Sequence, residues 1–230
     1  MEIKVLKDIL SANNQIAEQN RQLLANKNIL AVNLMSSPGA GKTTLILRAI
    51  QVLKGKARVG VIEGDVSSSI DTKKLSEVGV RAIQINTGGD CHLDASMVNS
   101  ALANLPLDDI DVLFIENVGN LICPGGFDLG EHLKVIILST PEGDDKPYKY
   151  PLLFTIADAL VVNKIDLLPY VNFDMDSFYR AVKGMNQKAA LFAVSGITGE
   201  GIEDWGSWII ENLGKVRSVK SKPTKRAEAS

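Results

Sequence analysis

The sequence predicts a doubly wound α/β fold, in which a mostly parallel sheet is flanked by helices and preceded by a short helical extension. Two observations lead to this prediction. Short runs rich in Val, Ile and Leu recur along the chain, and amphipathic helical patterns follow most of them. Strands of such composition are buried on both faces, which requires a parallel sheet covered by helices. In such folds, ligands bind at the carboxyl ends of the strands.

The apolar runs and the helical patterns alternate from the first expected strand onward. The expected strands are residues 29–35, 57–63, 81–86, 112–116, 134–139, 159–163 and 190–194. The clearest helical patterns cover residues 42–54, 92–103, 174–185 and 201–213. No internal repeat or low-complexity linker interrupts this series, so residues 29–214 are expected to form one domain.

Two appendages flank the expected domain. Residues 1–28 are predicted to be helical, because apolar residues recur there at roughly helical spacing. Asn13 and Asn14 lie in the middle of this segment and are expected to break it into two helices. Residues 215–230 are predicted to be a solvated, disordered tail, because they are basic and carry almost nothing apolar. The basic residues of the tail are Lys215, Arg217, Lys220, Lys222, Lys225 and Arg226.

Composition excludes several classes of protein. With 45% hydrophobic and 23% charged residues, the 230-residue chain has the balance of an ordinary globular protein. Its net charge of −2 provides no overall field that would favour nucleic acid or an anionic membrane as a partner. The N-terminal segment has no continuous apolar block, and no stretch approaches the roughly 18 apolar residues of a membrane span. With only two cysteines and no mark for export, the chain is expected in the cytoplasm.

A glycine-rich loop stands between the first expected strand and the helix that follows it. Residues 36–43 read Ser-Ser-Pro-Gly-Ala-Gly-Lys-Thr, close to the P-loop pattern, although Ser36 replaces the usual first glycine. Glycines let backbone N–H groups surround phosphate oxygens, and the helix N-terminus adds a favourable dipole. Lys42 is expected to reach the β- and γ-phosphates, and the Thr43 hydroxyl to bind Mg²⁺. The predicted phosphate-binding residues are Pro38, Gly39, Ala40, Gly41, Lys42, Thr43 and Thr44.

A second motif predicts which nucleotide is bound. An Asn-Lys-Ile-Asp sequence follows the sixth expected strand. The Asp166 carboxylate can accept from both N1–H and the 2-amino group of guanine, whereas adenine would face it with a lone pair. The stem of Lys164 can cover the base, and Asn163 can tie this loop to the phosphate loop. Ser195 and Gly196, after the last expected strand, fit the loop whose backbone approaches guanine O6. The chain is therefore predicted to be a GTPase.

Acidic residues at strand ends are the candidates for holding Mg²⁺. Asp65 follows the second expected strand, and Glu116 ends the fourth. The sequence Glu-Asn-Val-Gly from Glu116 to Gly119 has the form of a γ-phosphate sensor, because its glycine lets a backbone N–H approach the phosphate. No arginine or glutamine stands out as a catalytic group, which predicts slow intrinsic hydrolysis. The catalytic candidates are Lys42, Thr43, Asp65 and Glu116, and those for magnesium are Thr43, Asp65 and Glu116.

Soft metal ligands form a third constellation. Cys91 and His92 are adjacent, and Cys123 lies four residues beyond the glycine of the expected phosphate sensor. Two thiols and an imidazole suit Zn²⁺ or Ni²⁺. Three ligands leave a four-coordinate site incomplete, and a two-fold dimer could supply the rest. The spacing is not that of a zinc finger, so a packing role for both cysteines stays open. His132, the other histidine, is expected to be a surface residue.

Taken together, these motifs resemble the HypB family, the hydrogenase nickel-incorporation GTPases of the SIMIBI class of P-loop proteins. The resemblance covers about residues 5–213, and it depends on the contiguous Cys-His pair occurring with the Glu-x-x-Gly…Cys-Pro block. The matching segments are residues 36–44, 63–65, 91–95, 116–124, 141–146 and 163–166.

The resemblance implies a cytoplasmic metallochaperone that dimerises with GTP and binds Ni²⁺ or Zn²⁺ at Cys91, His92 and Cys123. It also implies nickel delivery, with a HypA-type partner, to the precursor of the [NiFe]-hydrogenase large subunit, and HypA docking on the N-terminal segment. The chain departs from some relatives in having no cysteine before Cys91, no His-rich stretch and no additional phosphate-loop lysine. Nickel storage is therefore not expected.

Three other functions remain as alternatives. A urease-type nickel GTPase would place a proline between the cysteine and the histidine, which are contiguous in this chain. A metal-free GTPase acting as chaperone of another metalloenzyme would use Cys91 and Cys123 for packing only. A small-molecule kinase is disfavoured by the Asn-Lys-Ile-Asp motif and by the lack of an evident acceptor pocket.

Overall fold

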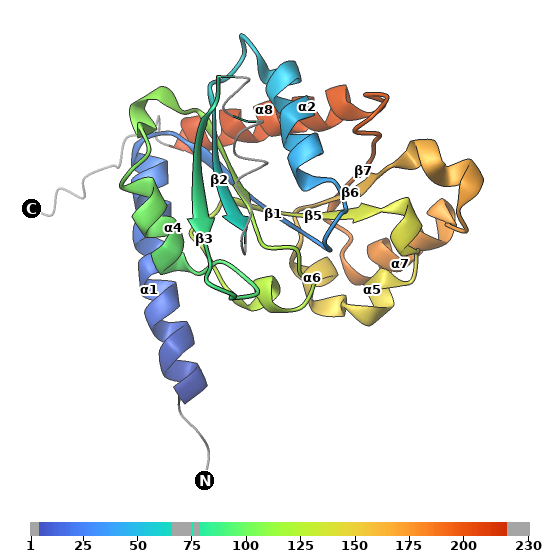
Figure 1. The fold of residues 1–230 in the computed structure, drawn as a ribbon, viewed down its shortest axis with the longest axis horizontal. Coiled ribbons are helices and arrows are strands. Elements are labelled where there is room, and N and C mark those ends of the chain that lie inside the picture. Colours follow the sequence, from blue (N-terminus) through green and yellow to red (C-terminus); the bar gives the residue numbers. More distant parts are fainter. Residues whose placement is uncertain (1–4, 66–74, 76–78, 220–230) are drawn as a thin grey trace, which may run out of the picture.

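A computed structural model describes residues 5–65, 75 and 79–219 and contains a parallel sheet with helices on both faces (Figure 1). Within the described residues the strand order is β3-β2-β4-β1-β5-β6-β7, and every strand pairs in parallel with its neighbours. The doubly wound α/β prediction is confirmed. The strands are β1 Leu30–Ser36, β2 Val59–Asp65, β3 Arg81–Asn86, β4 Val112–Glu116, β5 Leu133–Ser139, β6 Ala159–Asn163 and β7 Ala190–Ala193.

α-Helices or short 3₁₀ turns lie between most of these strands. The α-helices are α1 Val5–Asn26, α2 Lys42–Leu53, α4 Ala95–Leu102, α5 Lys146–Lys149, α6 Pro151–Ile156, α7 Met175–Met185 and α8 Ile202–Val219. The 3₁₀ turns are η1 Leu107–Asp109, η2 Cys123–Gly126, η3 Thr140–Glu142 and η4 Ile165–Tyr170. None of the helices in the described part of the chain is long and apolar enough to cross a membrane.

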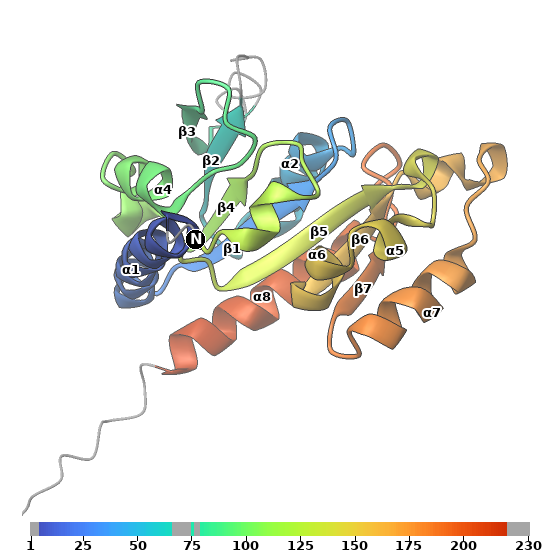
Figure 2. The ribbon, with the colours of Figure 1, turned by 90° about the horizontal axis from the view of Figure 1, so that it is seen from below.

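The two faces of the sheet are covered by different helices, as the two views show (Figures 1 and 2). Consecutive residues of β4 lie on opposite faces of the sheet: Phe114 packs with α2 and α8, and Ile115 packs with α1 and α4. Helices α6 and α7 cover the rest of that second face, over β5 and β6. Because both faces are buried, the carboxyl edge of the sheet is where the loops meet solvent.

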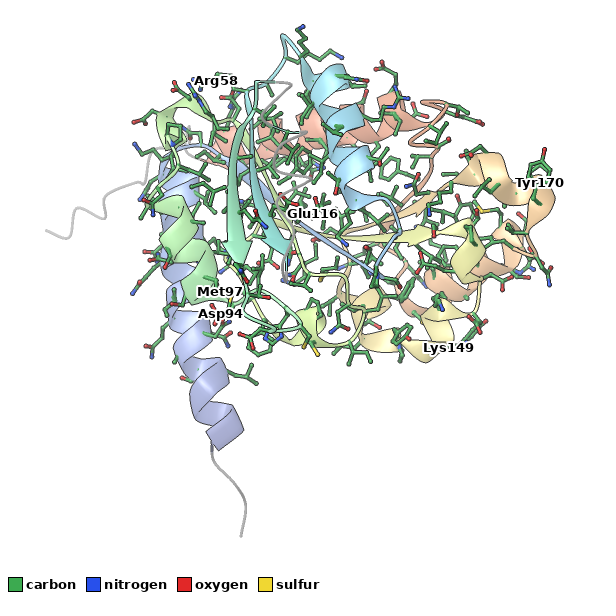
Figure 3. All side chains as sticks on the ribbon, viewed as in Figure 1. Arg58, Asp94, Met97, Glu116, Lys149 and Tyr170 are labelled. Atoms are coloured by element: carbon green, nitrogen blue, oxygen red, sulfur yellow. The ribbon has the colours of Figure 1, made fainter. Side chains whose placement is uncertain are left out.

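Helix α4 is shorter at its start than the sequence pattern indicated. It begins at Ala95 rather than at His92, because the Asp94 side chain accepts a hydrogen bond from the Met97 N–H and caps the helix. Asp94 and Met97 lie together at this helix end in Figure 3. His92 is thereby left in the loop that precedes the helix.

The prediction that Asn13 and Asn14 break the N-terminal helix is wrong, because α1 is continuous from Val5 to Asn26. The Asn13 side chain makes tertiary hydrogen bonds instead of competing with the helix backbone. It donates to the Asp128 carbonyl (2.8 Å) and accepts from the Ala95 N–H (2.9 Å). Asn20 is also buried and donates to the carbonyls of Ala95 and Leu129. Both asparagines therefore hold α1 against α4.

Helix α8 extends through Val219, so residues 215–219, which were expected to belong to the tail, are helical. Within this last part Arg217 donates to the Asp111 carboxylate at 2.6 Å. The same carboxylate accepts from the backbone and side chain of Arg58, and the Arg58 hydrogen bond holds the pKa of Asp111 below its usual range. The rest of the expected tail, residues 220–230, lies outside the described residues.

Candidate functional site

The loop between β1 and α2 has the backbone of a phosphate-binding loop. Gly39 and Gly41 adopt positive φ angles of 75° and 97°, which favour glycine. A Cβ on Gly41 would lie 2.5 Å from the Asn163 side-chain nitrogen, so the space also requires glycine. Ser36, which replaces the usual first glycine, is the last residue of β1, and its φ is not positive. The serine is therefore accommodated without strain.

A cavity of about 750 Å³ opens between this loop and the ends of β2 and β4. Lys42, only 9% exposed, points back to donate to the Ser36 hydroxyl at 2.9 Å. The loop after β4 forms the opposite wall. The lining residues are Pro38, Gly39, Gly41, Lys42, Thr43, Thr44, Leu47, Glu63, Gly64, Glu116, Asn117, Val118 and Gly119. The predicted phosphate sensor thus faces the phosphate loop, and a Cβ on Gly119 would come within 3.0 Å of the Pro38 backbone.

Oxygen ligands suited to Mg²⁺ gather in this cavity. The Thr43 hydroxyl donates to the Glu116 carboxylate at 2.9 Å, and Figure 3 shows Glu116 near the centre of the molecule. Glu63, which the sequence analysis did not assign to the site, lies beside Glu116 in the β2–β4 register. The side chains of Glu63 and Glu116 are 3% and 7% exposed. Buried carboxylates and a hydroxyl form the hard donor set that Mg²⁺ prefers. Asp65 ends β2, but its side chain lies outside the described residues.

The Asn-Lys-Ile-Asp loop after β6 is tied to the phosphate loop, as expected. The Asn163 amide donates to the Ala40 carbonyl at 2.9 Å, and Lys164, at a positive φ of 62°, donates to the Gly39 carbonyl at 2.7 Å. Asp166 accepts from the Ser195 hydroxyl at 2.5 Å. The predicted base-binding groups are therefore brought together, with the phosphate loop on one side.

The three soft ligands also come together. The donor atoms of Cys91, His92 and Cys123 all lie within 4.8 Å of one another, and Cys91 is exposed. The Cys91 sulfur lies 3.6 Å from His92 Nδ1, while the hydrogen bond to Cys123 raises the pKa of the Cys91 thiol. The His92 ring packs on Phe127 with centroids 4.0 Å apart. An exposed thiol with two further donors in reach fits a metal-ligand role better than a packing role.

The loop that carries Cys91 and His92, the candidate metal-ligand loop, packs against the candidate nucleotide site. Leu93, next to His92, is fully buried and packs on β2 where a Cβ on Gly64 would approach it within 2.8 Å. Its N–H donates to the side-chain oxygen of Asn117 at 3.1 Å. Asn117 is only 1% exposed and stands between Glu116 and the Gly119 loop. The two sites therefore share a wall.

A series of hydrogen bonds between buried polar side chains holds Asn117 in place. The Asn117 amide donates to Asn33 on β1 (3.2 Å), and the Asn33 amide donates to the Glu131 carboxylate (3.2 Å). Lys134 neutralises Glu131 at 2.6 Å. Asn33 and Glu131 were not identified from the sequence, and Asn117 was included only as a member of the expected phosphate sensor. The available signal was polar residues within or beside apolar strands.

His132 is not a free surface residue, contrary to the prediction. Its Nδ1 accepts a hydrogen bond from the Ala31 N–H at 3.1 Å. Burial lowers the pKa of His132, so the neutral ring is favoured in the folded chain. The ring joins β5 to β1 at the edge of the sheet opposite the cavity, away from both candidate sites.

Comparisons with known proteins agree with this geometry. Residues 30–193 match the family described as CobW/HypB/UreG, nucleotide-binding domain. The hydrogenase maturation factor HypB of Escherichia coli (strain K12) is 47% identical over 202 residues, which are 88% of this chain and 70% of that protein. The chain belongs to the HypB family.

Solved HypB structures share this fold over most of the chain. HypB from Archaeoglobus fulgidus superimposes with a TM-score of 0.83 at 40% identity, covering 89% of this chain and 100% of that one. HypB from Helicobacter pylori, solved in complex with nickel, gives a TM-score of 0.85 at 35% identity, covering 89% and 96%. The predicted resemblance to the HypB family is thus confirmed, together with its P-loop fold of the SIMIBI class.

Proposed function

We propose that this protein is a cytoplasmic, GTP-hydrolysing nickel metallochaperone for the maturation of [NiFe]-hydrogenase. The observation that carries the proposal is the shared wall between the two sites. The Cys91–His92 loop donates to Asn117 through Leu93 N–H, and Asn117 lines the nucleotide cavity. A nucleotide that moves the loop after β4 would thus move a metal ligand.

The nucleotide half of the proposal uses groups that are already in place. Asp166 reads guanine, Asn163 and Lys164 join the base loop to the phosphate loop, and Lys42 stabilises charge on the β- and γ-phosphates. Thr43 and Glu116 would hold Mg²⁺ with Glu63 beside them, and the ion would neutralise phosphate charge. No arginine lines the cavity among the described residues, which supports slow intrinsic hydrolysis.

The metal half follows from the exposure of Cys91. Two thiols and one imidazole leave at least one coordination position open, and a second copy of the chain would complete the site. We propose that GTP promotes this dimer and that Ni²⁺, or Zn²⁺ in its place, is held between the subunits. A cargo site near the surface can pass its ion to another protein, for which buried ligands would be unsuited.

The proposed partners follow from family membership. Relatives named as hydrogenase maturation factors support a role in hydrogenase maturation. The specific partners that we propose are those implied by the sequence resemblance, a HypA-type nickel chaperone and the hydrogenase large-subunit precursor. Helix α1, which packs on α4 just after the metal-ligand loop, is the proposed docking element for the HypA-type protein. The contiguous Cys91 and His92 favour this function over a urease-type GTPase.

Equilibrium dialysis tests the proposal directly. Ni²⁺ or Zn²⁺ is dialysed against the protein loaded with GDP or with a non-hydrolysable GTP analogue, and light scattering gives the mass of each form. The expected result is stoichiometric metal binding that changes with the nucleotide and is lost in the Cys91→Ala, Cys123→Ala double variant. Binding that is indifferent to both nucleotide and mutation would refute the metallochaperone function and leave a GTPase of another kind.

A further inference from the structure

Arg48, a partly exposed residue of α2, holds the loop that follows β7. Its Nε donates to the Gly196 carbonyl at 2.8 Å, and its Nη2 donates to the Ile197 carbonyl at 2.6 Å. One guanidinium therefore binds two consecutive carbonyls of a loop that is far away in sequence. The planar fork of arginine suits such a pair of acceptors, whereas a lysine ammonium acts as a single point donor.

The same two peptide units are held at their other ends by a serine. The N–H groups of Ile197 and Thr198 donate to the Ser195 hydroxyl oxygen at 3.3 and 3.0 Å. Their carbonyl partners in these peptide units are the groups bound by Arg48. With both ends bound, neither peptide plane can rotate without breaking two hydrogen bonds.

The chain of hydrogen bonds continues to the carboxylate that reads the base. Ser195, whose oxygen accepts from the loop, donates its own proton to Asp166 at 2.5 Å. The Gly196 N–H donates to the Asn163 side chain at 3.1 Å, and a Cβ on Gly196 would meet the Thr44 methyl at 2.9 Å. The loop is thus fixed between the first turns of α2 and the base-reading motif.

We propose that Arg48 is a positioning residue for guanine recognition, which rests on the proposed GTPase function. It transmits the position of α2, the helix opened by the phosphate loop, to Asp166 through the peptides after β7 and through Ser195. Arg48 touches neither phosphate nor base in this role. Its loss would loosen Asp166 while the phosphate loop keeps its own geometry.

The test compares the binding of three ligands that contact different parts of the site. GDP presents both groups that Asp166 accepts, IDP lacks the 2-amino group, and inorganic tripolyphosphate probes the phosphate loop alone. We expect Arg48→Met to weaken GDP binding about tenfold, equivalent to about 1.4 kcal/mol. In the same variant the ratio of GDP affinity to IDP affinity is smaller than in wild type. The affinity for tripolyphosphate stays within about twofold of wild type. Arg48→Lys, which keeps one donor, gives an intermediate loss.

Lys54→Met, which removes an exposed cation at the end of the same helix, is the matched control and should bind all three ligands as wild type does. Unchanged GDP binding in Arg48→Met, or an equal loss of tripolyphosphate binding, would overturn the positioning role. If Arg48→Met fails to fold by circular dichroism, Arg48→Lys decides on the same criteria. Wild-type protein that does not bind GDP at all would instead refute the proposed GTPase function.

Discussion

The nucleotide cavity and the metal-ligand cluster are neighbours, but they are built differently. Lys42 lines the cavity, and Asn163 and Ser195 belong to the candidate base-binding loops; all three are nearly buried and are held by hydrogen bonds within the protein. In the cluster, Cys91 is exposed and Cys123 is half-buried on the 3₁₀ turn η2. The first arrangement is preorganised for one ligand, whereas the second leaves ligands free to exchange. This difference suits the proposed function, in which the nucleotide site must be specific and the metal site must release its ion.

The largest expected effect is a loss of nucleotide binding, because the nucleotide cavity is the preorganised site of the two. Gly41→Ala places a Cβ 2.5 Å from the Asn163 amide at a backbone φ of 97°. The left-handed backbone alone costs about 1–2 kcal/mol, and the clash breaks the link between the two loops. We expect GTP affinity to fall by about 100-fold or more. Isothermal titration measures this, with Gly184→Ala, which meets no neighbouring atom, as the control. Wild-type affinity in Gly41→Ala would show that the loop adapts to its ligand.

The second prediction distinguishes the metal-ligand cluster from the nucleotide cavity. Cys123→Ser replaces a soft ligand by a hard one and should weaken Ni²⁺ or Zn²⁺ binding by roughly 100-fold. GDP affinity should stay within about twofold, because the sulfur is not a lining group of the nucleotide cavity. Competition with a chromophoric chelator gives the metal affinity, and Cys91→Ser should behave alike. A loss of GDP binding of similar size would mean that the two sites are one.

A third variant tests the shared wall. Asn117→Ala removes the acceptor of the Leu93 N–H and the hydrogen bond from the Asn117 amide to the Asn33 side chain. The free energy of unfolding should therefore fall by about 1–3 kcal/mol. The difference between the metal affinities measured with GDP and with a GTP analogue should then become much smaller, because the buried linking hydrogen bond is gone and only the exposed Asn120 contact to the Cys91 carbonyl remains. Asn104→Ala, which removes an exposed hydrogen bond to the Ser100 carbonyl, serves as the control and should keep the full nucleotide dependence. Full coupling in Asn117→Ala would refute this route.

The smallest effect lies outside both sites. Because burial lowers the pKa of His132 in the folded chain, its contribution to stability is complete above the ordinary histidine value of about 6.5. That contribution is lost as the pH falls from there through the lower pKa of the folded state. Urea denaturation at pH 7.5 and 5.5 should therefore show a smaller acid loss in His132→Gln, whose side-chain oxygen can still accept from Ala31 N–H. An identical loss in both proteins would contradict this account.

Much of the nucleotide site was predictable because its signals are local. The turn from β1 into α2 needs Gly39 and Gly41 at fixed offsets from Lys42, and these residues are neighbours in the chain. Glu63, Asn33 and Arg48 were missed, because their partners lie on other elements. Glu63 meets Glu116 only through strand register, and Arg48 meets Gly196 only once α2 lies beside the loop after β7.

The N-terminal segment shows that a local sequence signal can also give a wrong prediction. Asn13 was expected to break the helix, which is its usual effect when its side chain competes with the backbone. In the folded chain the Asn13 side chain accepts a hydrogen bond from the Ala95 N–H at the start of α4, and α1 is continuous. A local propensity of a few tenths of a kcal/mol is smaller than the hydrogen bonds that tertiary contact provides.

The sequence by itself determined the parallel α/β fold, the phosphate loop and the family of this protein, because hydrophobic periodicity and motif spacing act over short stretches of chain. The sequence also grouped Cys91, His92 and Cys123, and the structure brings their donor atoms within 4.8 Å of one another. Only the tertiary structure decided that Asn117 joins the Cys91–His92 loop to the candidate nucleotide cavity and that Arg48 holds the loop after β7. These contacts depend on the order of strands in the sheet and on helix packing. Distances between residues far apart in sequence are set only when the whole core closes.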